Sequence, residues 1–161
     1  MDFVPITKEG YERLKKELER LQREERPRVI KAIEEARGHG DLSENAEYEA
    51  AKERQALVEA QINDLCDKLS RCRIIEDFDR SEDRVTFGCT VVVEDVDTGA
   101  TERYRLVGPY EAQVERGSIS ITSPIGKALL GREVGDEVEV KTPKGIRRLE
   151  ILSVEWNHNG K

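Results

Sequence analysis

The sequence is poor in aromatic residues and has no long run of apolar side chains. Aromatic residues make up 5% of its 161 residues, whereas charged residues make up 38%. That is too polar for one compact globule, and it fits a long two-helix element beside a modest core. No apolar run approaches the roughly 20 residues of a membrane-spanning helix. The first residues show no basic region followed by an apolar stretch, so we expect a cytoplasmic protein with no membrane partner.

Cysteine and histidine are also scarce, which limits the chemistry. Cys66, Cys72 and Cys89 are odd in number and are never spaced as C-x-x-C. Neither a disulfide framework nor a tetrahedral zinc site is therefore supported, and we interpret the thiols as small apolar residues. With two histidines in the chain, His39 and His158, a nucleophile–histidine pair is disfavoured. The net charge of −7 argues against a free-standing nucleic-acid binder, because such binding relies on Lys and Arg.

Residues 1–76 carry the periodicity of two long helices. The first begins after Thr7, a plausible N-cap, and its apolar residues recur at three- and four-residue steps: Tyr11, Leu14, Leu18 and Leu21, then Val29, Ile30 and Ile33. Pro27 lies inside this pattern and removes a backbone donor, so we expect a bend or break near Arg26. The second helix alternates steps of four and three throughout: Glu44, Tyr48, Ala51, Gln55, Val58, Ile62, Leu65, Leu69 and Cys72.

These two arms predict an antiparallel coiled-coil hairpin. Each has about 30 residues, which corresponds to a rod roughly 45 Å long, and a turn of a few residues makes the arms antiparallel neighbours. Gly38 and Gly40 would end the first helix, because glycine adopts the backbone angles of a sharp exit without steric cost. One continuous helix that dimerises with a partner is the less favoured alternative.

The period changes after residues 77–86, which we predict to be a polar linker. Short strands are expected at 91–93, 104–107, 118–121, 138–140 and 149–152, with turns at 97–99 and 143–145. One short helix should start at Ser123, with Pro124 at its first position, and end at Gly131. Residues 87–161 therefore form a small β-rich domain, and the fold class is α+β.

Two acids stand at the predicted tip, within residues 38–45. Asp41 and Glu44 fit a capping box of the second helix, in which both carboxylates satisfy backbone N–H groups. They also fit oxygen ligands for Mg²⁺, which takes one or two protein carboxylates and leaves its other positions to other groups. Two acids alone would hold the ion weakly, so a partner would have to complete the site. The residues by themselves leave both readings open.

Arg37 ends the first arm and Lys52 lies two turns into the second. In a hairpin they fall at similar heights and form a small positive spot beside the acids, where a phosphate backbone could be held. The alternative is two ordinary solvated charges.

The run from Arg37 to Glu53, with its Asp-Leu-Ser-Glu-Asn-Ala-Glu-Tyr core, closely resembles the signature of bacterial Gre transcript-cleavage factors of the GreA type. Pro27 with the 29–33 segment is similar to that family's first arm. The segment 123–131 and the turn at 142–145 are similar to its C-terminal domain. The resemblance thus extends along almost the whole chain.

The resemblance implies an N-terminal coiled coil (1–76), a linker (77–86) and a C-terminal FKBP-like domain (87–161) that docks on bacterial RNA polymerase. The coiled coil would enter the polymerase secondary channel and stimulate cleavage of backtracked nascent RNA at its 3′ end. Asp41 and Glu44 would then help to hold a second Mg²⁺ that is shared with the polymerase active site, with no cofactor bound stably. Arg37 and Lys52 would contact RNA, and Ser123, Pro124 and Ile125 would dock on the polymerase. The expected protein is an accessory factor, a monomer with no nuclease activity of its own.

Other functions remain to be weighed. The main alternative is an inhibitor of the same fold that enters the channel without stimulating cleavage. Further acids at the tip would favour such an inhibitor. Leu42, Ser43 and Asn45 are not acidic, so the stimulator is preferred. A prolyl isomerase would need an aromatic-lined pocket, and residues 85–161 hold four aromatic residues. A purely structural coiled coil would explain the heptads but not the tip. The mixed charge of the hairpin, with Arg37, Lys52 and Arg54 near the tip, predicts release of short RNA fragments.

Overall fold

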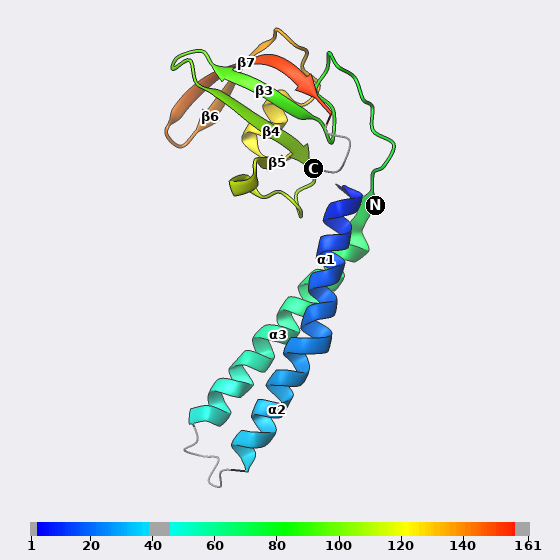
Figure 1. Ribbon diagram of the computed structural model, residues 1–161. Coiled ribbons are helices and arrows are strands. Elements are labelled where there is room, and N and C mark those ends of the chain that lie inside the picture. The colour runs from blue at the N-terminus through cyan, green and yellow to red at the C-terminus, as the bar shows by residue number, and fades with distance from the viewer. Residues whose placement is uncertain (1–2, 39–45, 157–161) are drawn as a thin grey trace. The chain divides into compact units, whose positions relative to one another are not determined.

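The computed structural model describes residues 3–38 and 46–156 (Figure 1). It confirms the α+β class, with a helical hairpin and a curled sheet. The described chain divides into two compact units. One is Glu12–Arg71, and the other joins the residues up to Tyr11 to those from Cys72 onward. No helix in the described ranges is long and apolar enough to cross a membrane.

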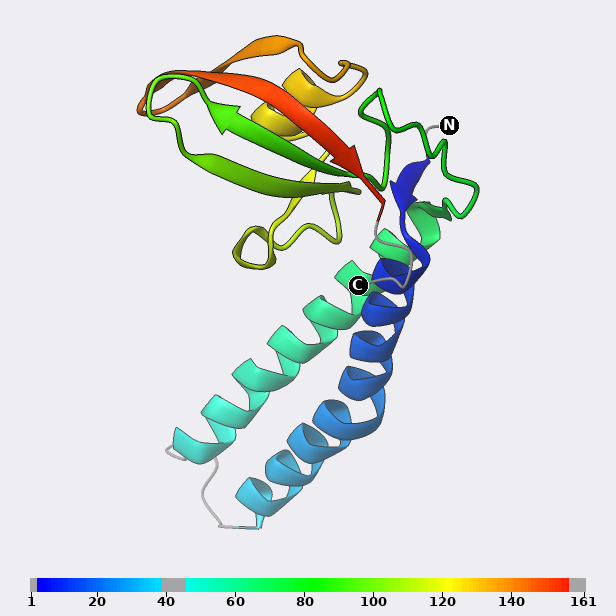
Figure 2. The same ribbon diagram turned by 45° about the horizontal axis from the view of Figure 1, so that its top comes forward.

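The first unit is built from α1 (Lys8–Arg20) from Glu12 onward, a π-helical turn η1 (Leu21–Glu25), α2 (Arg26–Arg37) and α3 (Ala46–Arg71). Figures 1 and 2 show α2 and α3 side by side, with the end of α2 and the start of α3 at the same end of the pair. The arms are therefore antiparallel, as predicted. A single file of apolar side chains holds them together: Leu21, Val29, Val58, Ile62 and Leu65 are buried, with Leu14, Leu18 and Ile33 packed against them.

The seam predicted for the second arm is confirmed wherever the structure describes it. Every member from Tyr48 to Cys72 is buried or half-buried, and the remaining member, Glu44, lies outside the described residues. The helix itself ends at Arg71, so that Cys72 begins a short strand instead.

The stripe predicted for the first arm is confirmed at Val29 and Ile33 but is wrong at Ile30, which is 42% exposed, and Ala36 also faces inward. An uninterrupted helix that continued the steps of Leu14, Leu18 and Leu21 would bring 28, 32 and 35 to the seam, one residue before the positions observed. A π-helical turn holds one extra residue, so η1 absorbs the shift. The irregularity comes one turn before Pro27, and the flanking residues Arg20 and Arg26 keep right-handed helical angles, so there is no break at Arg26.

The second unit is organised by a five-stranded sheet of order β5-β4-β3-β7-β6. Its strands are β3 (Thr90–Asp95), β4 (Thr101–Val107), β5 (Ser118–Ser120), β6 (Glu137–Thr142) and β7 (Gly145–Glu155). All neighbours are antiparallel except β4 and β5. These strands match the five predicted ones. The short helix α4 (Pro124–Leu129) and the turn η3 (Val114–Arg116) complete the domain.

The core lies on one face of this sheet. It contains twelve buried residues, from all five strands, from α4 and from the segment that precedes β3: Val85, Cys89, Val91, Val93, Leu106, Ile119, Leu129, Val138, Val140, Leu149, Ile151 and Val154. Alternate burial along β3 and β6 follows from the two-residue period of a strand.

Two short strands that the sequence did not predict belong to the same unit. β1 (Val4–Ile6) pairs in parallel with β2 (Cys72–Ile74). The N-terminal residues are therefore grouped with the sheet domain, whereas the sequence assigned all of 1–76 to the coiled coil. A strand of three residues is too short to show an alternation of apolar and polar side chains. The two strands are also separated in the sequence by nearly the whole hairpin, so local spacing could not reveal their pairing.

The predicted linker, residues 77–86, is packed rather than loose. Phe78 stacks on Trp156 with ring centroids 5.8 Å apart, and the Trp156 indole N–H donates to the Ser81 carbonyl at 2.8 Å. Val85 is buried in the core and its N–H donates to the Arg132 carbonyl at 2.8 Å.

Candidate functional site

The predicted tip acids, Asp41 and Glu44, lie outside the described residues, so the structure describes the helix ends that flank them. α2 ends at Arg37, and the Gly38 N–H donates to the carbonyls of Glu34 and Glu35 at 3.2 and 3.1 Å. Gly38 has φ −69° and ψ −7°, a right-handed conformation open to any residue. It does not adopt the special exit angles predicted for it. α3 begins at Ala46 on the other side of the tip.

The two basic residues predicted beside the tip are both exposed. The ion pair between Arg26 and Glu59 joins the two arms. Both basic residues lie on the tip side of this pair, Arg37 eleven residues beyond Arg26 and Lys52 seven residues before Glu59. The Lys52 amine lies 3.4 Å from the Gln55 amide oxygen, and in the described ranges neither Arg37 nor Lys52 has an ion pair.

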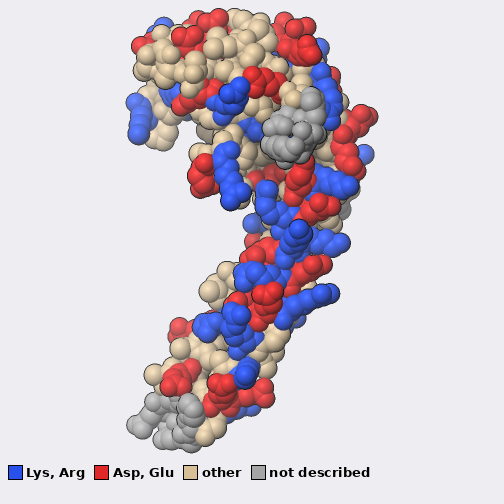
Figure 3. Space-filling view, in the orientation of Figure 1, with Lys and Arg blue, Asp and Glu red and all other residues tan. Residues whose placement is uncertain are grey.

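Further from the tip, ion pairs form both between the two arms and within the first arm. Arg26 donates two hydrogen bonds of 2.8 Å to the Glu59 carboxylate, and the hydrogen bonds hold the pKa of Glu59 below its usual value. The half-buried Glu25 carboxylate, in the π-helical turn, receives Arg28 at 2.7 Å and Arg20 at 3.3 Å, with Arg54 at 3.9 Å. Arg54, predicted to flank the tip, thus turns toward Glu25. Figure 3 shows basic and acidic side chains interspersed along this unit.

The segment predicted to dock, Ser123, Pro124 and Ile125, starts α4. The Ser123 hydroxyl caps the helix: it accepts from the Gly126 N–H at 3.1 Å and donates to the Ser120 carbonyl at 2.6 Å. Ile125 packs against the core. Pro124 is exposed and occupies the first helical position, where its missing N–H costs nothing. The structure therefore gives Ser123 and Ile125 structural contacts, and leaves Pro124 as the member that faces solvent.

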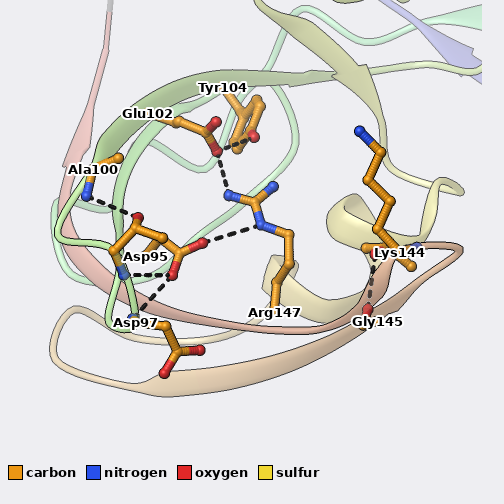
Figure 4. A network of polar contacts seen from close by, with 10 residues as sticks. Asp95, Asp97, Ala100, Glu102, Tyr104, Lys144, Gly145 and Arg147 are labelled. Carbon is orange, nitrogen blue, oxygen red and sulfur yellow. Dashed lines mark hydrogen bonds and ion pairs between the residues drawn. The ribbon is translucent and has the colours of Figure 1, made fainter.

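Four polar side chains, those of Asp95, Glu102, Tyr104 and Arg147, form a network on the face of the sheet that also carries the apolar core (Figure 4). The Arg147 guanidinium donates to Glu102 at 2.8 Å and to Asp95 at 3.3 Å, and the Tyr104 hydroxyl donates to the same Glu102 oxygen. Strand register puts these four residues on the face of the core, because each lies opposite a core residue: Tyr104 opposite Val91, Glu102 opposite Val93, Asp95 opposite Leu149 and Arg147 opposite Val140.

Electrostatics keeps the carboxylates of this network ionised. The hydrogen bond from Tyr104 and then the one from Arg147 lower the pKa of Glu102. Burial raises the pKa of Asp95, but the N–H groups of Asp97 and Thr98 and the Arg147 guanidinium outweigh it, so the pKa is lowered. Neither carboxyl is suited to act as a general acid near neutral pH. Tyr104, the aromatic residue of this network, is hydrogen-bonded to Glu102, so the network gives an isomerase pocket no support.

Two of the three cysteines, Cys72 and Cys89, are buried at least in part, as predicted for small apolar residues, whereas Cys66 is exposed. Burial raises the pKa of Cys89 to about 11 and also raises that of Cys72, which disfavours the thiolate needed for nucleophilic attack or metal binding. In residues 3–38 and 46–156 no group of three or more His, Cys, Asp or Glu side chains could hold a metal ion.

One polar node was missed by the sequence analysis. The buried Glu111 carboxylate accepts hydrogen bonds from the Thr7 N–H at 2.9 Å, the Gly108 N–H at 2.8 Å and the Thr7 hydroxyl. Thr7 in turn caps α1, since its hydroxyl accepts from the Gly10 N–H at 3.1 Å. A Cβ on Gly10 would lie 2.1 Å from a Glu111 carboxylate oxygen. Neither the spacing nor the neighbours of Glu111 signal this role in the sequence.

Comparison with known proteins covers both units. Residues 4–74 match the family model described as the N-terminal domain of transcription elongation factors, and residues 80–156 match the GreA/GreB C-terminal model. The chain is 63% identical to the transcription elongation factor GreA of Syntrophobacter fumaroxidans, over 96% of this chain and 99% of that protein. It is 53% identical to GreA of Caulobacter vibrioides strain NA1000 / CB15N, over 97% and 99% of the two chains.

A solved structure of GreA factor homolog 1 from Thermus thermophilus is 39% identical, covers 95% of this chain and 99% of its own, and superposes with a TM-score of 0.43. On the two matched models and the near-complete alignments, the chain belongs to the GreA/GreB family of transcription elongation factors.

Proposed function

We propose that this protein stimulates bacterial RNA polymerase to cleave backtracked nascent RNA, releasing short 3′ fragments and rescuing arrested complexes. The observation that supports it most strongly is the 63% identity to a GreA factor over 96% of the chain. The tip motif lies inside that aligned range. It connects α2 and α3, whose apolar side chains pack against each other. A same-fold channel inhibitor has no support from the GreA relatives.

The proposed mechanism delivers two carboxylates to an active site that the protein does not itself contain. Phosphodiester hydrolysis with two metal ions needs both ions clamped around the attacking and leaving oxygens. Asp41 and Glu44 would complete the ligand set of a second Mg²⁺ whose other ligands come from the polymerase and the RNA. The ion-paired and apolar seam between α2 and α3 keeps the arms together, so that the acids travel as a pair.

The other predicted roles follow from position and exposure. Arg37 and Lys52, both exposed and both on the tip side of the Arg26–Glu59 pair, would hold the phosphates of the extruded RNA end. On the sheet domain, Pro124 is the docking residue with a free surface, while Ser123 and Ile125 would act by fixing the start of α4. We place the protein in the cytoplasm with the polymerase and propose that it acts as a monomer, which sedimentation at micromolar concentration would test.

The deciding experiment is RNA cleavage in backtracked elongation complexes with wild type, Asp41→Asn and Glu44→Gln. Asn caps a helix about as well as Asp but lacks the anionic oxygen that Mg²⁺ favours. We expect each variant to lose at least about tenfold in cleavage rate, with unchanged binding to polymerase and unchanged helix content.

Glu47→Gln, just inside α3, is the matched control and should retain activity. Full cleavage by Asp41→Asn would mean that capping is the sufficient role of Asp41. The same RNA incubated without polymerase should stay intact, and cleavage there would contradict the accessory role.

A further inference from the structure

The end of β7 forms an open sheet edge. On one side, β3 pairs with β7 as far as Thr90 opposite Glu155, whereas on the other side β6 starts only at Glu137 opposite Glu150. One more residue is covered, because Ile151 donates to the Asp136 carbonyl and accepts from the Gly135 N–H, both at 2.9 Å. Beyond Ile151, β7 has a strand partner on one side only among the described residues, and Figure 2 shows its end extending past β6.

The register fixes which residue faces this open side. Val93 lies opposite Ile151 and Val92 opposite Ser153, so Leu152 is the extra residue of a β-bulge. Ile151 directs its N–H and C=O away from β3, and alternation resumes after the bulge. Val154 therefore directs its main-chain N–H and C=O to the same side as Ile151. Its side chain is perpendicular to the sheet, on the core face.

A cavity of about 670 Å³ lies along this edge. Val154 contributes to its wall, as expected if its main chain faces it, and Leu152 and Val134 add apolar surface. Leu152 and Val134 are 39% and 41% exposed. The cavity thus offers main-chain groups next to apolar side chains, which is what an added strand requires.

The opposite wall is the segment 80–83, and it is held in place. The Asp83 carbonyl accepts from the Val134 N–H at 2.8 Å, and the Ser81 carbonyl accepts from the Trp156 indole at 2.8 Å. The Arg80 guanidinium lies 5.5 Å from the centre of the Trp156 ring. A wall fixed at three points can define a groove instead of collapsing onto the edge.

The groove carries a surplus of negative charge. Glu82, Asp83 and Glu155 line it, against Arg80 as the basic residue. Glu155 also pairs with Arg103 of β4, two strands away in the sheet, at 2.9 Å. Glu82 and Asp83 are exposed on the wall, where a cationic side chain could reach them.

We propose that this groove binds a short extended peptide segment of a partner protein that carries Lys or Arg side chains, by adding it as a strand to β7. The Val154 N–H and C=O would pair with the peptide main chain, Leu152 and Val134 would contact its apolar positions, and Glu82 and Asp83 would take its cations. The stretch 152–156 spans roughly 13–17 Å, room for three or four residues. The inference concerns the sheet domain and does not depend on the tip acids.

The test is an NMR titration of the full-length, ¹⁵N-labelled protein with the peptide acetyl-Lys-Val-Lys-Val-Lys-amide. We expect saturable shifts at the amides of 152–156 and at the Trp156 indole, with a Kd on the order of 1 mM. The peptide acetyl-Glu-Val-Glu-Val-Glu-amide should cause no saturable shift there. The double variant Glu82→Lys/Asp83→Lys should weaken binding of the basic peptide at least about fivefold and admit the acidic one.

The matched control is Glu115→Lys/Glu139→Lys, which changes the net charge equally at exposed sites away from the groove and should keep the affinity within about twofold. Absence of saturation, equal response to both peptides, or shifts that map to the outer edge of β6 would each overturn the proposal. Because no polymerase is present, its failure would leave the cleavage function untouched.

Discussion

The hairpin and the sheet domain bury apolar surface in different ways. The core cluster of the hairpin has five buried residues in one file along two arms, whereas that of the sheet domain gathers twelve around a common centre. A side chain in the file has solvent on both flanks, and one at the centre has neighbours on every side. The hairpin is therefore stabilised by apolar residues at a regular helical spacing and by ion pairs, whereas the sheet domain is stabilised by the close packing of its core. Substitutions in the two units can test that difference.

The largest effect is expected from truncation at the centre of the sheet domain. Leu149 is fully buried, so Leu149→Ala should cost about 4 kcal/mol, the transfer term plus an unfilled cavity. Ile62→Ala in the hairpin should cost about 2 kcal/mol, since the seam lies beside solvent and can relax. Urea unfolding should be followed by far-UV circular dichroism for helices and by the fluorescence of Trp156, the single tryptophan, because the units can unfold separately. Equal losses would contradict the comparison.

Two glycines give the next contrast. A Cβ on Gly126 would lie 2.0 Å from the Ser120 carbonyl oxygen, whereas one on Gly38 would meet its nearest atom at 3.4 Å. Gly126→Ala should therefore cost about 3 kcal/mol, because backbone must move in a packed domain. Gly38→Ala should change stability by less than about 0.5 kcal/mol, since its angles suit alanine. Thermal unfolding of both variants checks the pair, and a destabilised Gly38→Ala would reveal a constraint at the end of α2.

These contrasts also explain how much the sequence could predict. The seam of α3 was predicted member by member because one helix of uninterrupted period needs only spacing. The strands followed from alternation and turns, and the start of α4 from Ser123 and Pro124. In the first arm the same reasoning placed Val29 and Ile33 correctly but misplaced Ile30, because adjacent helical residues point about 100° apart and a narrow seam buries only one of them. The π-helical turn itself leaves no mark in the composition. Pro27 predicted an irregularity but not its type.

Other features depend on contacts between residues far apart in the chain. The hydrogen bonds of Glu111 to Thr7 join positions separated by 104 residues, and the steric limit on Gly10 comes from that same carboxylate. The groove beside β7 depends on where β6 starts and on a bulge opposite Val92. None of these features can be predicted from the spacing of neighbouring residues along the chain. The tip acids were predicted from a motif, and their role stays a prediction.

A smaller effect is expected from the polar network, through pH. Hydrogen bonds from Tyr104 and Arg147 lower the pKa of Glu102, so its contribution to stability is present above the ordinary pKa of a glutamate and is lost as the pH falls through the lowered value. Glu102→Gln should therefore be less stable by about 0.5–1 kcal/mol at neutral pH, a discounted figure because the side chain is 42% exposed. The difference should vanish in acid.

Urea midpoints at several pH values measure this effect. Glu139→Gln, at an exposed position of β6, should match wild type throughout. A Glu102→Gln deficit that persists unchanged in acid would mean that packing, and not the charge, is responsible.

The smallest effect is expected from the hairpin's best ion pair. Arg26 and Glu59 make two hydrogen bonds of 2.8 Å, but their side chains are 37% and 41% exposed, so a double-mutant cycle with Arg26→Met and Glu59→Gln should give a coupling of about 0.5 kcal/mol. At 1 M NaCl, where the screening length is about 3 Å, this coupling should largely disappear. The matching cycle on Arg147 and Glu102, with Arg147→Met and Glu102→Gln, should retain more of its value, because the Arg147 side chain is 28% exposed and is also held by Asp95. Equal salt sensitivity of the two couplings would show that partial burial on the sheet gives its ion pairs no protection, and that the two units differ in apolar packing alone.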